Sequence, residues 1–492
     1  MTIHSGSVAN PAVSTTRSLT YETIRACLVS DGLWRRDHSD SFRIGTTPFL
    51  LSHEELTLLS ALGLQLFAFY RALNRLYLDS VRGQAPAWIQ RYLDQGKPES
   101  LVTFARMNRF RDLLPDVIRP DLLLTDHGPL MTELDAVPGG IGLTGSLAAI
   151  YATGRSDVIG GAQGMVQGFA DMCRFRLEGR PPTVAITVSD ESEDYRAEMQ
   201  WVASRLGSFG IEAACVHPRA LRFTDEGVWL PDRFGKQPVS LVYRFFELFD
   251  LPNIPKSELI QYCAKKGLVG VTPPYKPWLE EKMAFALLQH PVLEPYWRQV
   301  LGMETFETLQ HLTPKTWILD PQPLPPTAVI PGLTHRGQPV TDWRILAHAT
   351  QKERHFVVKP SGFSPLAWGS RGVAIGHDLP QTEWAAVIDR ALEAFPRTPH
   401  ILQSFHKSRR VTMDYWSPDT KEPRTMVGRV RLCPYYFVHQ DGVSLGGILA
   451  TICPIEKKVI HGMRDAVMVP CSIADHASST RTSEQGPGGP RS

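Results

Sequence analysis

IRPDLLLTDHGPLMTELDAVPGG, residues 118–140, is the most informative segment of the sequence. Two short apolar runs flank the tripeptide Asp126-His127-Gly128. Apolar runs on either side of polar turn residues are typical of a β-hairpin, and a helix is expected after it. The hairpin and its helix form one expected module, residues 116–175.

Four charged side chains are expected on one face of this hairpin. Residues two apart on a strand share a face, so Arg119 and Asp121 point the same way, and so do Glu133 and Asp135. Pairing about the turn places the first pair roughly opposite the second. Three carboxylates on one face repel one another unless a cation lies between them, and Mg²⁺ accepts carboxylate oxygens. A Mg²⁺ site is one interpretation, and a solvated face with an Arg–Asp ion pair is the other.

A second segment, HFVVKPSGFSPLAWGSRGVAIG (355–376), combines a lysine with a glycine-rich loop. Lys359 ends an apolar strand, and the loop after it contains Gly362, Gly369, Ser370, Arg371 and Gly372. Such a loop lets backbone N–H groups approach phosphate oxygens closely. The segment is neither a Walker A motif nor a dinucleotide fingerprint, so a glycine-rich hairpin with an incidental lysine is the alternative.

Two further polar residues are candidates for nucleotide binding. Lys282 follows a Pro-rich turn at the expected start of a helix, where the helix dipole disfavours a cation unless a ligand anion is present. Exposed helix lysines usually have no role. Gln403 lies on the expected strand HILQSF, whose backbone could pair with an adenine edge while Phe405 packs the base; an ordinary core strand is the alternative.

Arginines near the C-terminus could stabilise a phosphoryl group in transfer. Arg429 and Arg431 are two apart and therefore on one face of a strand, or else they are surface residues. Arg464 lies in a charged stretch that either lines the site or is solvated.

Composition limits the class of protein. The 492 residues are too many for one ordinary core and predict two to four sub-domains. Hydrophobic residues make up 43% and charged residues 21%, which excludes wholesale disorder. The net charge of +2 gives no reason to expect nucleic acid or a membrane as partner, so the expected partner is a small molecule. The oligomeric state is not indicated.

The expected compartment is the cytoplasm. The seven cysteines are scattered without zinc-like spacing and are expected to be reduced thiols. The N-terminus has no secretory apolar run, and no run of about 18 apolar residues predicts a membrane helix.

A strand–helix–strand alternation starts at PTVAITVSD and predicts a parallel sheet. The expected organisation is a disordered tail (1–18), a helical N-terminal region (19–115), the hairpin module (116–175), an α/β module (176–275), a helical segment with a Pro-rich linker (276–353), a third module of strands and one helix (354–474) and a second disordered tail (475–492).

Taken in this order, the segments resemble glutathionylspermidine synthase and related acid–amine ligases. The resemblance lies in Arg119-Pro120-Asp121, in Glu133-Leu134-Asp135 before a proline, and in Lys282, the Lys359 loop and Gln403. It implies an α/β protein with an ATP-grasp core, a preceding parallel-sheet domain and a metal-binding segment moved to the N-terminal side.

The resemblance also implies roles for single residues. Asp121, Glu133 and Asp135 would hold Mg²⁺ bound to ATP, and Arg119 would contact the acyl phosphate. Lys282 and Lys359 would bind the nucleotide phosphates. Asp135 replaces the family's usual Asn, and the family's C-terminal Gly-Ile-Arg-Glu signature is missing. Arg431 and Arg464 are the candidates to replace its arginine.

The expected reaction is ATP-dependent amide formation between a carboxylate and an amine through an acyl phosphate. A nucleotide-binding protein with reduced turnover and a phosphotransferase that uses the same site are the alternatives.

Overall fold

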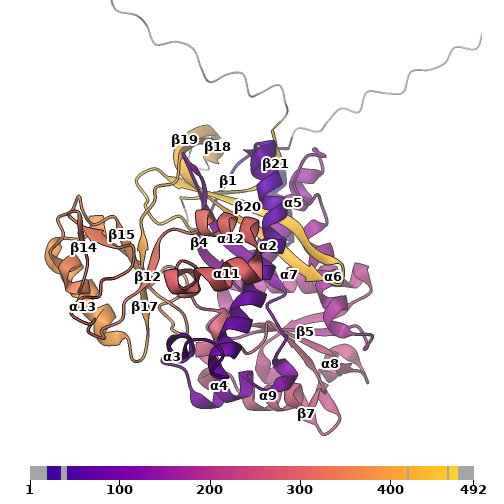
Figure 1. Ribbon diagram of the computed structural model, residues 1–492. Coiled ribbons are helices and arrows are strands. Elements are labelled where there is room, and N and C mark those ends of the chain that lie inside the picture. The colour runs from indigo at the N-terminus through magenta and orange to yellow at the C-terminus, as the bar shows by residue number, and fades with distance from the viewer. Residues whose placement is uncertain (1–18, 35–41, 418–419, 463–464, 475–492) are drawn as a thin grey trace, which may run out of the picture.

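The computed structural model describes residues 19–34, 42–417, 420–462 and 465–474. Within these ranges the chain is a mixed α/β protein in which an eight-stranded sheet joins strands from the N-terminal and C-terminal parts of the described chain (Figure 1). The sheet has the order β1 (Arg43–Ile44), β21 (Val467–Ile473), β20 (Gly442–Pro454), β19 (Glu422–His439), β3 (Val117–Thr125) and β4 (Gly128–Asp135), with β2 (Phe49–Leu51) paired to β21 and β18 (Arg410–Ser417) paired to β19. The predicted tails, 1–18 and 475–492, lie outside the described residues.

The predicted hairpin is confirmed as β3 and β4. Thr125 pairs with Gly128 across the turn, Asp121 pairs with Glu133, and Arg119 pairs with Asp135. The antiparallel register therefore places the four charged residues on one face, as the two-residue spacing predicts. Because β3 also pairs with β19, this face lies beside the long C-terminal strands.

The predicted parallel sheet is also confirmed. Its strands have the order β11 (Gly270–Thr272), β10 (Leu241–Phe245), β5 (Thr183–Val188) and β6 (Glu212–Val216), with α7 (Arg196–Leu206) between β5 and β6 and α9 (Ser257–Lys266) between β10 and β11. Every residue of β5 is buried, which explains its continuous apolar sequence. A small sheet of β7 (Arg222–Thr224), β8 (Gly227–Trp229) and β9 (Pro238–Val239) accompanies it.

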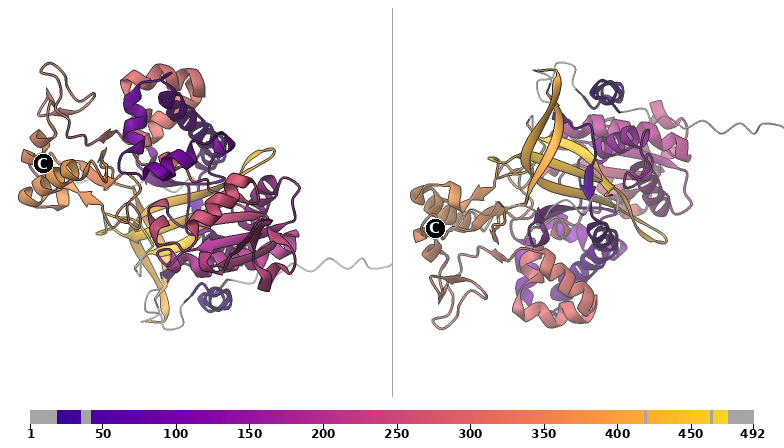
Figure 2. Two further views of the ribbon diagram at one scale, coloured as in Figure 1. Left: turned by 90° about the horizontal axis from the view of Figure 1, so that it is seen from below. Right: turned by 90° about the horizontal axis from the view of Figure 1, so that it is seen from above.

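A third sheet forms a lobe at one side of the molecule, coloured orange in Figures 1 and 2. Its order is β12 (Thr316–Ile318), β17 (His400–Ser404), β15 (Phe356–Pro360) and β16 (Ala374–Ile375), beside the short hairpin of β13 (Thr334–His335) and β14 (Gln338–Pro339). Helix α13 (Gln381–Ala394) covers one face, where Trp384 and Ile388 pack with Val358 and Leu402.

The sheets divide the chain differently from the segments expected from the sequence. Strand β12 comes from the segment expected to be helical with a Pro-rich linker, 276–353. It pairs with β17, which in turn pairs with β15. Strands β18 to β21 come from the expected third module, 354–474, and join the eight-stranded sheet instead. Sheet membership depends on long-range pairing, which local periodicity does not contain.

Helices pack against the eight-stranded sheet and against one another (Figure 2). They are α1 (Tyr21–Ser30), α2 (His53–Val81), α3 (Ala87–Asp94), α4 (Glu99–Ala105), α5 (Ile141–Ala152), α6 (Gly164–Leu177), α10 (Ala284–Leu288), α11 (Glu294–Leu301) and α12 (Met303–Leu312). Ser52 and Glu55 form a capping box at the start of α2. By length and composition α2 is long and apolar enough to cross a membrane, and 44% of its apolar window is buried in the protein. All seven cysteines are free, as expected.

Candidate functional site

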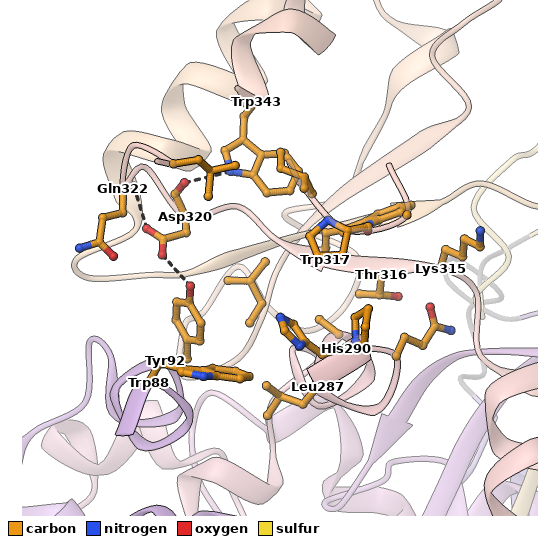
Figure 3. A pocket seen from close by; sticks show the side chains of 18 of the residues that line it. Trp88, Tyr92, Leu287, His290, Lys315, Thr316, Trp317, Asp320, Gln322 and Trp343 are labelled. Atoms are coloured by element: carbon orange, nitrogen blue, oxygen red, sulfur yellow. Dashed lines mark hydrogen bonds between the residues drawn. The ribbon is translucent and has the colours of Figure 1, made fainter. Parts of the chain in front are cut away.

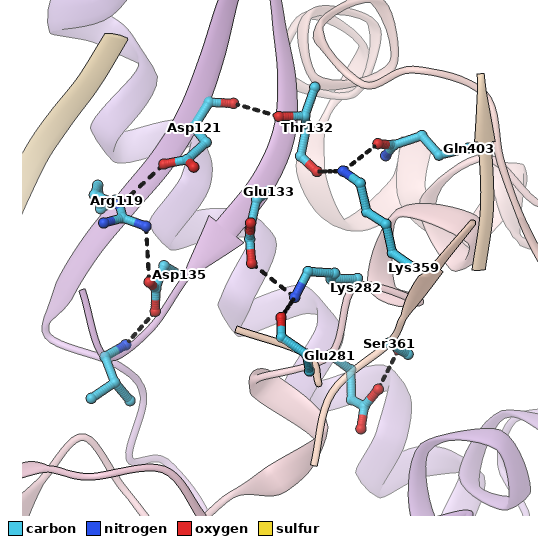
Figure 4. A network of polar contacts seen from close by, with 12 residues as sticks. Arg119, Asp121, Thr132, Glu133, Asp135, Glu281, Lys282, Lys359, Ser361 and Gln403 are labelled. Carbon is cyan, nitrogen blue, oxygen red and sulfur yellow. Dashed lines mark hydrogen bonds and ion pairs between the residues drawn. The ribbon is translucent and has the colours of Figure 1, made fainter. Parts of the chain in front are cut away.

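The acidic face of the hairpin is paired with arginines. Arg119 lies 3.3 Å from the Asp121 carboxylate and 3.0 Å from that of Asp135 (Figure 4). Arg431, from β19, lies 2.6 Å from the other oxygen of Asp121, Oδ2. The Cys433 thiol donates at 3.4 Å to Oδ1, the oxygen that faces Arg119. The expected Arg–Asp pair therefore exists, and Arg431 belongs to the same network.

These pairings set the charge of the two aspartates differently. Burial would raise the pKa of Asp121, but Arg119 and Arg431 outweigh it and hold this pKa below its ordinary value. Burial raises the pKa of Asp135, and Arg119 offsets only part of that rise. Asp121 is therefore firmly ionised, whereas Asp135 takes up a proton more readily.

The two candidate lysines reach the same hairpin from distant segments. Lys359 donates from Nζ to the Thr132 carbonyl oxygen at 3.2 Å and to Oε1 of Gln403 at 3.0 Å. Lys282 lies 2.8 Å from the Glu133 carboxylate and donates to the Ala367 carbonyl oxygen at 2.7 Å (Figure 4). Two ammonium groups and the acidic face thus form one continuous network.

The lysines differ in their protonation. Burial lowers the pKa of Lys282, but Glu133 outweighs it and raises this pKa above its ordinary value. Burial lowers the pKa of Lys359 to about 8, and Glu133 offsets only part of that fall. Lys282 therefore stays charged over the physiological range, whereas Lys359 can lose its proton in mildly alkaline solution.

The glycine-rich loop lies against this network. A Cβ on Gly362 would lie 2.6 Å from the Glu280 carbonyl oxygen, so only glycine fits there. Gly369 and Ser370 have φ values of +62° and +59°, which form a left-handed turn. Arg371 points to the parallel-sheet region, where it pairs with Glu191 at 2.8 Å. Gly372 is also closely packed, since a Cβ there would lie 2.6 Å from Pro360.

The structure corrects two expectations about individual residues. Lys282 was expected to begin a helix, but α10 begins at Ala284, so Lys282 lies just before the helix. Strand β17 has neighbours on both sides, so the backbone of Gln403 is used within the sheet and is not free for an adenine edge. The Gln403 side chain instead bridges Lys359 and Thr316. Arg464 lies outside the described residues.

Sequence reasoning missed several charged residues next to the lysines. Glu281 is buried and pairs with Lys97 at 2.6 Å, and it also accepts a hydrogen bond from Ser361 at the start of the loop. Glu280 pairs with the fully buried Arg244. The signal was present, since Glu280 and Glu281 directly precede Lys282, but their partners come from elsewhere in the chain.

A small cavity of about 50 Å³ lies between the hairpin and the loop, lined by Glu133, Asp135, Glu247, Glu280 and Lys282 among others. Burial and the neighbouring carboxylates raise the pKa values of Glu247 and Glu280 above the ordinary range. At least part of this acidic lining is therefore protonated near neutral pH.

The carboxylates are chemically suitable for Mg²⁺ but are not arranged as a ligand cluster. No group of three or more His, Cys, Asp or Glu side chains is placed to hold a metal ion in the part of the chain that the structure describes. The hairpin carboxylates are directed to arginine and lysine side chains instead. A metal at Asp121, Glu133 and Asp135 therefore remains a prediction that requires these ion pairs to open.

No protein-family model matches the chain, and no curated protein sequence matches it. Solved structures that are similar to the chain include two that cover most of its length. One is a candidate γ-glutamylcysteine synthetase from Methylobacillus flagellatus, with a TM-score of 0.39 and 10% identity over 87% of this chain and 89% of that chain. The other is a glutathione synthetase-like effector (GSS30) from Globodera pallida in its apo form, with a TM-score of 0.52 and 11% identity over 92% of this chain and 95% of that chain.

The chain has an ATP-grasp fold. At 11% identity the likeness to the effector concerns the fold alone. Within this ATP-grasp fold, the network of Asp121, Glu133, Lys282 and Lys359 is where the hairpin of the eight-stranded sheet, strand β15 of the third sheet and the glycine-rich loop approach one another.

Proposed function

We propose that this chain is an ATP-dependent ligase that joins a carboxylic acid to an amine through an acyl phosphate. The observation that carries the proposal is the meeting of Lys282 and Lys359, from separate segments, on the acidic hairpin. Two cations beside several carboxylates suit a polyphosphate that arrives with a divalent ion. The ATP-grasp fold and the resemblance seen in the sequence support the same class of reaction.

In this proposal each residue has a defined task. Lys282 and Lys359 exchange their protein partners for phosphate oxygens of ATP. Mg²⁺ enters with the nucleotide and would neutralise phosphate charge, with Asp121, Glu133 and Asp135 as its predicted ligands. Arg119 and Arg431 lie beside Asp121 and would stabilise the γ-phosphoryl group in transfer.

The chemistry needs no covalent intermediate on the protein. A substrate carboxylate oxygen attacks the γ-phosphorus and ADP leaves, after which the amine attacks the acyl carbon and inorganic phosphate leaves. The loop from 361 to 372 contacts the network through the Lys282–Ala367 hydrogen bond, so its closure would keep water from the acyl phosphate. Small acid and amine substrates in the cytoplasm are the partners in this proposal.

Two observations favour a second candidate, a nucleotide-binding protein with reduced turnover. Asp121 is held by two arginines, and the missing C-terminal signature removes an arginine that the resemblance would supply. Such a protein would bind ATP at the same lysines without consuming it.

Purified full-length protein incubated with MgATP and a panel of acids and amines tests the proposal. The expected result is ADP and phosphate release that requires both an acid and an amine, with a product whose mass equals acid plus amine minus water. Glu133→Ala is the blank. ATP binding without ADP release in any combination would favour the reduced-turnover protein, and a phosphorylated product without an amide would show a phosphotransferase.

A further inference from the structure

A cavity of about 700 Å³ lies beside the edge strand β12 (Figure 3). None of the hairpin residues lines it, and its lining residue Thr316 accepts a hydrogen bond from Gln403 of the lysine network. Its walls come from α3, from the segment around His290 after α10, from β12, and from the Pro-rich stretch 321–332. That stretch was expected to be a plain linker, but it forms one wall of the cavity. The volume is that of a small-molecule site.

Aromatic rings form much of the lining. Trp88 lies 5.8 Å from Tyr92 and 4.9 Å from the His290 ring, measured between ring centroids. The indole N–H of Trp317 donates to the Pro331 carbonyl oxygen at 2.8 Å, and that of Trp343 donates to the Asp320 carbonyl oxygen at 2.9 Å. Because their N–H groups are bonded to the protein, these indoles offer a ligand carbon surface and ring faces.

One carboxylate, that of Asp320, supplies the negative charge of this lining. Asp320 accepts a hydrogen bond from the Tyr92 hydroxyl at 2.6 Å and from the backbone N–H of Gln322 at 2.8 Å. Among the described residues no lysine or arginine pairs with it. Lys315 also lines the cavity, but Figure 3 shows it at the opposite end from Asp320. The carboxylate therefore has no neutralising partner.

His290 and Tyr92 add no positive charge near Asp320, whereas the charge of Arg91 acts on Tyr92 and offsets part of the rise in its pKa. Burial lowers the pKa of His290, so its ring is neutral at physiological pH, and its Nδ1 accepts from the Val292 backbone N–H at 3.3 Å. Burial and the hydrogen bond to Asp320 raise the pKa of Tyr92, which keeps its proton. The end of the cavity around Asp320 is thus negative and aromatic.

We propose that this cavity binds an organic ammonium ion. Its charge pairs with the Asp320 carboxylate, and its carbon body lies against the rings of Trp88, Tyr92, Trp317 and Trp343. The faces of aromatic rings carry negative charge density and attract cations, so rings and carboxylate favour the same ligand. A carboxylate or phosphate ligand would meet repulsion from both at this end of the cavity.

Isothermal titration calorimetry on the full-length protein without nucleotide tests the proposal with three matched probes. They are phenethylamine, which is a cation at neutral pH, the neutral phenethyl alcohol and the anion phenylacetate. We expect phenethylamine to bind at least about tenfold more tightly than either analogue. Asp320→Asn keeps the size of the side chain and an acceptor oxygen, and it should weaken phenethylamine binding about tenfold or more.

Three control variants separate the cavity from general effects. Asp342→Asn removes an aspartate that likewise accepts from the backbone N–H two residues ahead but does not line the cavity, and it should leave binding unchanged. Lys315→Gln should leave binding of the cation unchanged or strengthen it. Glu133→Ala should bind phenethylamine as the wild type does, since Glu133 does not line the cavity.

Three outcomes would overturn the proposal. The first is that phenylacetate or phenethyl alcohol binds as tightly as phenethylamine. The second is that none of the three probes binds with a Kd below about 1 mM, and the third is an unchanged phenethylamine affinity in Asp320→Asn. If Asp320→Asn does not fold, the three probes on the wild type and on Lys315→Gln decide the question. Loss of phenethylamine binding in Glu133→Ala would place the cation in the hairpin site instead.

Discussion

The Lys282 ammonium group lies 2.8 Å from the Glu133 carboxylate and joins two segments that are far apart in the sequence. Lys282 is a predicted phosphate ligand and Glu133 a predicted ligand of Mg²⁺. In this ion pair each of the two residues therefore blocks the other from binding MgATP. MgATP can replace both halves of the pair at once, whereas metal-free ATP can replace only one.

The first prediction follows from this pair. Glu133→Gln frees Lys282, so ATP in the presence of EDTA should bind about fivefold to tenfold more tightly than to the wild type. Turnover with MgATP should fall at least about 100-fold in the same variant. Equilibrium binding and ADP release measure the two effects, and weaker EDTA–ATP binding in the variant would contradict the competition.

Lys359 predicts a pH dependence of nucleotide binding. Burial lowers its pKa from the ordinary 10.5 to about 8, so its charge is lost as the pH rises through about 8. ATP affinity of the wild type should therefore fall between pH 7 and pH 9. Lys359→Arg stays charged and should show a flat profile over this range. A wild-type affinity independent of pH would show that Lys359 does not bind phosphate.

The same group affects stability in a defined direction. Because the folded pKa is below the unfolded value, the unfolded chain holds more protons between about pH 8 and pH 10.5. The contribution of Lys359 to the free energy of unfolding should therefore rise with pH across this window. Urea titrations of the wild type and Lys359→Met at pH 8 and pH 10 measure it as the difference between the two proteins.

Asp121 and Asp135 should respond differently to the same substitution. Asp121 is 4% exposed and held by two arginines, so Asp121→Asn should lower the free energy of unfolding by about 3–5 kcal/mol. Asp135 is half-buried and has one arginine, and the resemblance has Asn at this position. Asp135→Asn should lose less than about 1 kcal/mol and should need more Mg²⁺ for half-maximal activity. Equal losses in the two variants would contradict this difference.

Arg371 and Glu191 allow a test of the role of the loop. Their ion pair is partly exposed, so breaking it should cost only about 0–1 kcal/mol. Glu191→Gln and Arg371→Met both remove the pair, but only Arg371→Met removes a candidate phosphate ligand. If Arg371 binds ATP, the KM for ATP should rise about tenfold in Arg371→Met and less than about twofold in Glu191→Gln. Equal effects would assign Arg371 to holding the loop alone.

Lys276 predicts a purely structural effect. It is 1% exposed and donates to Oδ1 of Asn74 at 3.0 Å and to the carbonyl oxygens of Arg111 and Leu113 at 2.8 and 2.7 Å. Lys276→Met leaves these acceptors without their donor and should lower the free energy of unfolding by about 2–4 kcal/mol. The exposed Lys265→Met should change it by less than about 0.5 kcal/mol. If Lys276→Met left the free energy of unfolding unchanged, water would have replaced the ammonium group as the donor to these acceptors.

The hairpin part of the site could be predicted, because its residues lie close together in the sequence. The turn at Asp126-His127 and the two-residue period of the strands fix which side chains of β3 and β4 share a face. The glycine-rich loop is likewise visible as composition. Neither pattern shows that Arg431 would bind Asp121, because this contact depends on the pairing of β3 with β19, far along the chain.

The hairpin, the parallel sheet and the charged residues could be recognised in the sequence, because each follows from the spacing of side chains along a short segment. The pairing of each cation with its carboxylate, the use of the Gln403 backbone within its sheet and the place of Asp320 in an aromatic cavity became visible only in the folded chain. Local spacing fixes the direction of a side chain from its own element, whereas its partner depends on how separate elements pack.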